Sequence, residues 1–258
     1  MKVVFLGATK FSEELLFHLI ENKVIPRALF TIPREFDISY SQSKVKNYNY
    51  SDLEQLAGQH HIPCYLVNSS DKKITSYINV LEEIKPDVIL VMGWYYMVPK
   101  RVRDLATYGA WGIHASMLPD YAGGAPLVWA IINGETETGL TLFRLDDGID
   151  DGDIIAQEKI LIAENDSIKE VYENVTKLSK DILLRSLCNI SGIQFKSQDK
   201  SKIKIYPQRR PEDGEIDLTK PAKDLYNFIR AQSSPYPGAF IKTSDGKKLV
   251  IEKARIQE

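Results

Sequence analysis

Cysteine is scarce in this chain, with only Cys64 and Cys188 among 258 residues. The two lie far apart in the sequence and match no metal-ligand spacing, which argues against a disulfide framework and against a zinc site. We therefore expect no metal, and two reduced thiols that pack as small apolar residues.

Long hydrophobic runs and a basic excess are also lacking. The N-terminal apolar run is about five residues, whereas a signal peptide needs roughly 7–15 and a membrane span roughly 20. The formal net charge is -2, and phosphate binding needs clustered Lys and Arg. We expect a cytoplasmic protein with no membrane partner and no nucleic-acid partner.

What is present is an alternation of short apolar runs and amphipathic stretches. Because parallel strands need crossover helices, this alternation predicts an α/β fold with a mostly parallel sheet. Ligands bind at the carboxyl edge of such sheets, so we expect the loops after Leu6, Met92, Ile113 and Leu145 to meet there. Strands are predicted at 3–6, 28–32, 63–67, 88–92, 111–114 and 139–145, and helices from Ser12, from Asp52, at 74–84, at 124–132 and at 167–187.

The pattern changes near residue 192. A polar, Lys-rich stretch at 196–204 reads as a linker, followed by strand signals at 202–206, 240–243 and 249–251 around a helix at 222–231. Asp245-Gly246 is a hairpin signal between the last two strands. We predict a domain at 1–192 and a small α+β segment at 193–258, which packs on the main domain or on a second subunit because it is short.

Two segments could carry chemistry. His114 ends a predicted buried strand and is followed by the glycine-rich loop around Gly123 and Gly124, which suits catalysis, although a core histidine bonded to backbone is an equal alternative. Residues 145–153 hold five carboxylates in nine positions. They fit a solvated turn, do not match an EF-hand loop, and could face His114 if the two strand ends are neighbours.

Two further features have an open interpretation. Gly7-Ala8-Thr9 follows the first strand but lacks the G-x-G-x-x-G of dinucleotide-binding turns, so a simple strand-to-helix turn is the preferred reading. Residues 34–50 carry Tyr40, Tyr48 and Tyr50 and are predicted to form a long loop. This loop could cover a ligand or could be a surface loop with partly buried tyrosines.

Five stretches resemble the folate-dependent formyltransferases, a family that includes methionyl-tRNA, glycinamide ribonucleotide and nucleotide-sugar enzymes. They are GWYYMVPK, IHASMLPDYAGGAP, NGETETGLTLFRLDDGIDDGDII, YPQRRPEDGEIDL and SPYPGAF, and the similarity spans residues 1–242. The resemblance implies a Rossmann-like domain with helices on both faces of the sheet. It also implies 10-formyltetrahydrofolate as cosubstrate.

The resemblance also implies site residues. The family's catalytic His and Asp map onto His114 and Asp150, whereas its catalytic Asn position holds Gly112, a departure. Either another side chain fills that role, or His114 and Asp150 suffice with backbone donors. The folate-contacting stretches map onto Tyr96, Met97, Val98, Gly124, Asp146, Asp147, Gly148, Ile149 and Asp150.

The implied reaction is acyl transfer to an amine, which needs stabilisation of an oxyanion and removal of a proton from nitrogen. We expect His114 to donate a hydrogen bond to the oxyanion. Asp150 would orient His114, favour its charged form, or relay the amine proton.

The resemblance is nearest to nucleotide-sugar N-formyltransferases, through GGAPLVWAIINGETETG and YSQSKVKNYNYSDLEQLA. It implies a homodimer that formylates an amino-deoxy sugar such as dTDP-4-amino-4,6-dideoxyglucose or its 3-amino isomer, for surface polysaccharide (O-antigen, lipopolysaccharide) synthesis. The alternatives are methionyl-tRNA formylation, a hydrolase releasing formate, and a folate- or nucleotide-binding module without turnover. Six tail cations could contact tRNA or form a solvated face: Lys196, Lys200, Lys202, Lys204, Arg209 and Arg210.

Overall fold

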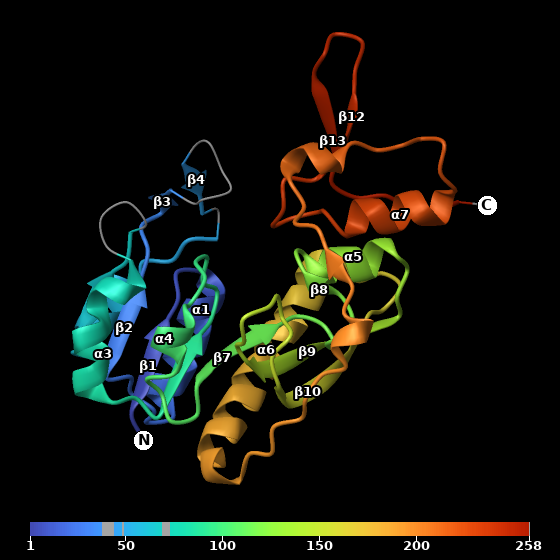
Figure 1. Ribbon diagram of the computed structural model, residues 1–258. Helices are drawn as coiled ribbons and strands as arrows, with labels where there is room; N and C mark the ends of the chain where they lie inside the picture. The colour runs from blue at the N-terminus through green and yellow to red at the C-terminus, as the bar shows by residue number, and fades with distance from the viewer. Residues whose placement is uncertain (38–43, 48, 69–72, 258) are drawn as a thin grey trace.

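A seven-stranded sheet with the order β10-β9-β7-β6-β1-β2-β5 forms the centre of the computed structural model (Figure 1). The structure describes residues 1–37, 44–47, 49–68 and 73–257. The five neighbouring strands β7, β6, β1, β2 and β5 are parallel to one another. The strand β9 runs antiparallel to β7, and β10 runs antiparallel to β9. The strands are β1 (Val3–Leu6), β2 (Ala28–Thr31), β5 (Cys64–Leu66), β6 (Val88–Val91), β7 (Ala110–His114), β9 (Glu137–Arg144) and β10 (Ile154–Leu161).

Helices cover both faces of this sheet, which confirms the predicted α/β class. Among the described residues, none of the helices has the length and apolar character that a membrane crossing requires. The helices are α1 (Lys10–Glu21), α2 (Leu53–Gln59), α3 (Ile78–Ile84), α4 (Lys100–Arg103), α5 (Pro126–Ile132), α6 (Ile168–Cys188) and α7 (Ala222–Arg230), with short 3-10 turns at Ile74–Tyr77, Ile190–Gly192, Lys200–Lys202 and Pro211–Gly214.

The alternation of side chains along β1 divides the core into two clusters. Val3 and Phe5 pack with residues of α1, α5 and α6 on one face, whereas Val4 and Leu6 pack with residues of α3 and α4 on the other. A strand buried on both faces must be apolar at every position. This requirement explains why 3–6 and 88–91 are continuous apolar runs.

The strand β10 was not predicted from the sequence. It pairs with β9 along its whole length, with a bulge between Ile154 and Ala156. As an edge strand it tolerates the polar stretch Gln157, Glu158 and Lys159, which hides the alternation that predicts strands. Its presence makes the loop at 145–153 a connection between antiparallel neighbours.

The start of α1 also differs from the prediction. Thr9, rather than Ser12, is the N-cap, and the two form a capping box in which the Thr9 side chain accepts from the Ser12 amide. Ser12 Oγ donates to the Met92 carbonyl at 2.5 Å. The helix therefore begins earlier than predicted and is tied to the loop that follows β6.

The tyrosine-rich stretch is not wholly a loop, because β3 (Glu35–Phe36) and β4 (Val45–Lys46) form a short antiparallel ribbon. Tyr50 makes an isolated bridge with Thr9. Tyr40 and Tyr48 lie outside the described residues.

The C-terminal segment contains the predicted elements. The hairpin of β12 (Ala239–Lys242) and β13 (Lys248–Ile251) turns at Asp245-Gly246 and projects from the body of the molecule (Figure 1). Arg230 of α7 donates to the Asp166 carbonyl at 2.6 Å, which ties this segment to the loop before α6.

Only one cysteine behaves as predicted. Cys64 is partly buried in β5, and this burial raises the pKa of its thiol to about 11. Cys188 is exposed at the end of α6, so the expectation that it packs as an apolar residue is wrong.

Candidate active site

The structure brings His114 and Asp150 together. His114 ends β7 and is 9% exposed. Its Nδ1 lies 3.5 Å from Oδ2 of Asp150, and the two side chains are 10% and 21% exposed. An imidazole and a carboxylate therefore face each other at the carboxyl edge of the parallel strands.

Asp150 reaches this edge by a route that the sequence did not predict. Because β9 is antiparallel to β7, it ends opposite the beginning of β7, where the Leu145 amide donates to the Ala110 carbonyl at 2.8 Å. The expectation that the loop after Leu145 starts at the ligand-binding edge is wrong. The acidic loop instead turns back along β7 until Asp150 lies beside His114.

Hydrogen bonds specify how protons are arranged in this pair. His114 Nε2 lies 2.8 Å from the Tyr121 carbonyl, which can only accept, so Nε2 carries a proton. Nδ1 is the nitrogen that faces the carboxylate. Asp150 Oδ2 also accepts from the Gly123 amide at 2.8 Å. Both ring nitrogens thus face protein acceptors, and Asp150 is the more accessible partner.

Gly112 leaves room that Leu145 fills. A Cβ at position 112 would lie 2.9 Å from Leu145 Cδ2 and 3.4 Å from Phe143 Cε1. An asparagine there would require Leu145 to move. Among the described residues, the apolar side chains of Leu145 and Phe143 therefore lie where the family resemblance leads one to expect the side-chain amide of an asparagine at position 112.

A row of polar side chains crosses the sheet at His114. Thr141 is its partner on β9, and Gln157 is the partner of Thr141 on β10. Thr141 Oγ1 donates to the Ser116 carbonyl at 2.7 Å and accepts from the Leu118 amide at 3.1 Å and from Gln157 Nε2 at 2.9 Å. These bonds fix the loop that follows His114. The feature of the sequence that could have identified this row is a threonine inside an otherwise apolar strand.

The acidic loop is held by cations from two other segments. Arg103 of α4 donates to the Leu145 carbonyl at 2.7 Å and pairs with Asp147. Lys200 lies 2.7 Å from Asp151 and 3.5 Å from Asp146. The Asp147 amide and these two cations lower the pKa of Asp146. Sequence reasoning did not single out Arg103, because an arginine in a short polar helix has no distinctive pattern.

Apart from Gly124, the predicted folate-contacting residues lie on two loops, the acidic loop and the loop after β6. Asp146 and Asp147 are engaged with cations, whereas Gly148 and Ile149 are exposed, Ile149 by 51%. On the loop after β6, Met97 is 71% exposed and Val98 is buried. Tyr96 packs on Phe36 and Trp94. Arg103 links these two loops, because the loop after β6 leads into α4, and Arg103 of α4 contacts Leu145 and Asp147.

Gly124 is required by packing. A Cβ there would lie 2.4 Å from Gln208 Cα, and the Gly124 amide donates to the Tyr206 carbonyl at 2.8 Å. The short strands β8 (Ala122–Gly123) and β11 (Ile205–Tyr206) pair in parallel at this point. The close approach is thus to the chain's own backbone.

Within the described part of the chain, no group of three or more His, Cys, Asp and Glu side chains could hold a metal ion. The acidic loop forms ion pairs with Arg103 and Lys200 instead.

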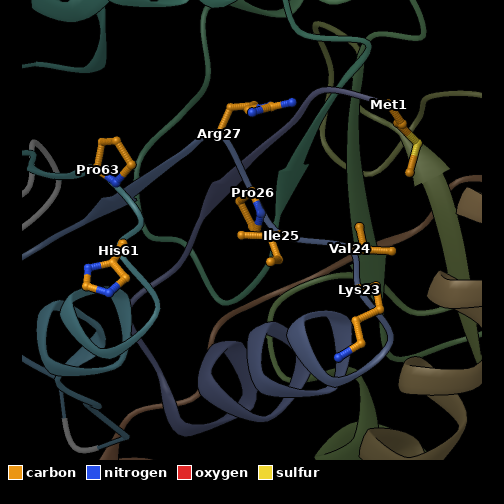
Figure 2. Close-up of a pocket in the computed structure, with 8 residues that line it drawn as sticks. All are labelled: Met1, Lys23, Val24, Ile25, Pro26, Arg27, His61 and Pro63. Atoms are coloured by element: carbon orange, nitrogen blue, oxygen red, sulfur yellow. The ribbon is translucent and has the colours of Figure 1, made fainter.

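A pocket of about 550 Å³ lies at the opposite edge of the sheet, before β2 and β5 (Figure 2). Neither His114 nor Asp150 lines it, so it is separate from the candidate site. Its lining residues are Met1, Lys23, Val24, Ile25, Pro26, Arg27, His61 and Pro63.

Comparison with known proteins agrees with this architecture. Residues 1–187 match the formyl transferase family model, and residues 209–258 match the formyl transferase C-terminal domain. A methionyl-tRNA formyltransferase from Caldanaerobacter subterraneus is 32% identical, over 100% of this chain and 82% of the relative.

Two solved structures share the fold at low sequence identity. A sugar N-formyltransferase from a Shewanella species has a TM-score of 0.74 at 18% identity and covers 100% of this chain and 99% of its own. An N-formyltransferase from Helicobacter canadensis, in complex with folinic acid and dTDP-3-aminofucose, has a TM-score of 0.66 at 22% identity, over 90% of this chain and 80% of its own. The chain belongs to the formyl transferase family and is a formyl-transferring enzyme.

Proposed function

We propose that this enzyme moves a formyl group from 10-formyltetrahydrofolate to the amino group of a nucleotide-linked amino-deoxy sugar. The sugar would be dTDP-4-amino-4,6-dideoxyglucose or its 3-amino isomer, and the product would serve surface polysaccharide synthesis in the cytoplasm. The observation that carries the proposal is the His114–Asp150 pair, 3.5 Å apart at the edge where α/β sheets bind ligands.

The geometry suits removal of a proton from an attacking amine. Asp150 is the more accessible member of the pair, so its carboxylate would accept the proton as the amine adds to the formyl carbon, and this proton would pass to folate N10 as the bond between N10 and the formyl carbon breaks and tetrahydrofolate leaves. His114 Nδ1 faces the same carboxylate and would share that proton. Donation from His114 Nε2 to the developing oxyanion would require the ring to leave the Tyr121 carbonyl.

Exposed apolar side chains on the acidic loop and on the loop after β6 would suit a flat, partly apolar cosubstrate. Met97 and Ile149 expose apolar side chains on two loops that Arg103 and Leu145 bring together. Such side chains would cover the ring system, because ligand sites combine an apolar lining with a few polar groups. Folate would supply the activated formyl group.

Electrostatics favour a sugar nucleotide over tRNA. Several of the tail cations that could contact RNA phosphates are already engaged within the protein. Lys200 pairs with Asp151, Lys202 lies 3.5 Å from Asp199, and Arg209 lies over the rings of Trp129 and Phe228. Tight RNA binding needs several free phosphate contacts.

Methionyl-tRNA formylation is the second candidate, and the 32% identity to a methionyl-tRNA formyltransferase favours it. We also propose that the enzyme is a homodimer associated through the segment 193–258. Its projecting hairpin exposes Leu249 and Val250 by 52% and 39%.

Thermal unfolding with dTDP, UDP and uncharged tRNA tests the acceptor class. A ligand at about 100 times its dissociation constant stabilises by roughly 2.7 kcal/mol. For a chain of this size, this corresponds to a rise in Tm of about 5–10 °C. We expect this rise with a nucleoside diphosphate and none with tRNA at physiological salt. Stabilisation by tRNA alone would replace the sugar proposal with the second candidate.

A further inference from the structure

We propose that Gln198 is a positioning residue that holds Asp150 against His114, an inference that rests on the proposed role of this pair. Gln198 lies in the segment 196–206, in which the sequence indicated a linker at 196–204. The structure instead shows this segment running beside the candidate site. There it contacts the acidic loop and the loop after β7.

The side chain of Gln198 holds the backbone around Asp150. Its Nε2 donates to the Asp150 carbonyl at 2.8 Å and to the Gly152 carbonyl at 2.7 Å. Asp150 has a φ of 51°, a left-handed conformation that few residues other than glycine adopt without cost. Two hydrogen bonds from one amide therefore hold the turn at the residue whose carboxylate faces His114.

The position of Gln198 is itself fixed by the backbone. Lys196 and Ile154 exchange both of their amide-to-carbonyl hydrogen bonds, at 2.8 and 2.9 Å. Ile154 begins β10, immediately after the acidic loop. Gln198 thus lies two residues from an anchor on the sheet, and its reach to Asp150 does not depend on a free loop.

The same segment also fixes the other group that contacts the Asp150 carboxylate. Ile205–Tyr206 pairs with Ala122–Gly123, and the Gly123 amide donates to Asp150 Oδ2 at 2.8 Å. The segment therefore holds the main chain of Asp150 through Gln198, and a donor to its side chain through β11.

Gln198 is held in place by the hydrogen bonds that it donates and not by bonds that it accepts. Gln198 Oε1 is buried and has no hydrogen-bond partner among the described residues. A buried acceptor without a partner costs free energy, so the two donated bonds must hold the amide in place. Without them the Asp150 turn can relax, and catalytic geometry is sensitive to displacements of about 1 Å.

The test compares two variants at position 198, Gln198→Ala and Gln198→Met, with the control Gln194→Ala. Methionine has a side chain of similar length to glutamine but no hydrogen-bond donor. Gln194 is an exposed glutamine four positions earlier, just before this segment. Steady-state formyl transfer would give kcat and the KM of each substrate, and hydrogen exchange would follow the peptide containing Gly123. We expect both Gln198 variants to lose kcat by about tenfold or more, with each KM within about twofold. We expect faster exchange at Gly123, and Gln194→Ala unchanged in both measurements.

Three outcomes would overturn the proposal: a kcat above half of wild type in Gln198→Met, a rise in KM with kcat unchanged, or unchanged exchange at Gly123. Melting temperatures check that each variant is folded. If Gln198→Ala is unfolded, the result for Gln198→Met decides the test. If the wild type transferred formyl to no acceptor, the proposed function would fail separately. The exchange measurement would still decide whether Gln198 holds Asp150.

Discussion

Asp150→Asn is expected to lower formyl transfer by about 100- to 1000-fold, the usual loss when one member of a proton-transfer or oxyanion site is removed. Asparagine tolerates the left-handed backbone that Asp150 adopts, at a φ of 51°, so the substitution removes the charge without straining the turn. The fall should appear in kcat measured under saturating folate and acceptor.

His114→Asn is expected to lose turnover to a similar extent, because the carboxylate then faces no ring that can share its proton. Asp104→Asn is the matched control. Asp104 pairs with Lys100 on the surface, where both side chains are more than half exposed, and surface ion pairs contribute little. If His114→Asn or Asp150→Asn kept more than about a tenth of wild-type turnover, the roles proposed here would be wrong.

Gly152→Ala is expected to have the second-largest effect, because it would deform the loop that carries Asp150. A Cβ at position 152 would lie 1.7 Å from the Arg144 carbonyl oxygen, which belongs to the backbone and cannot rotate away. We expect the free energy of unfolding to fall by roughly 3 kcal/mol, at the upper end for overpacking, and activity to fall at least tenfold. Urea unfolding and turnover measure the two effects.

Gly58→Ala provides the comparison for that substitution. Gly58 lies within α2, and apart from its chain neighbours and the helix's own backbone, no heavy atom of the described residues lies within 4 Å of the position that a Cβ would take. Alanine in a helix is favoured over glycine by up to about 1 kcal/mol, so this variant should be as stable as wild type or more stable. Equal stability of Gly152→Ala and Gly58→Ala would show that the loop adapts, and that its geometry does not depend on glycine.

Much of the fold follows from local patterns. The buried parallel strands are continuous apolar runs, and Asp245-Gly246 marks the hairpin, so both could be predicted from the sequence. β10 could not, since an edge strand with polar residues lacks a clear period. The antiparallel pairing of β9 with β7 was missed as well.

The candidate site was predicted only in part. His114 and Asp150 were identified through motif spacing and family resemblance, and the structure places them together. Arg103 and Gln198 could not be found this way, because each acts through contacts more than 40 positions away in sequence. The filling of the Gly112 site by Leu145 is likewise a tertiary contact between two strands that the sequence does not show to be antiparallel.

The most direct test of the proposed function is formation of tetrahydrofolate from 10-formyltetrahydrofolate, measured with a panel of dTDP- and UDP-linked 3-amino and 4-amino sugars and with methionyl-tRNA. We predict tetrahydrofolate release, together with a formylated product, only when an amino-sugar nucleotide is present. Release without any acceptor would indicate a hydrolase, and release with methionyl-tRNA alone would contradict the proposed acceptor.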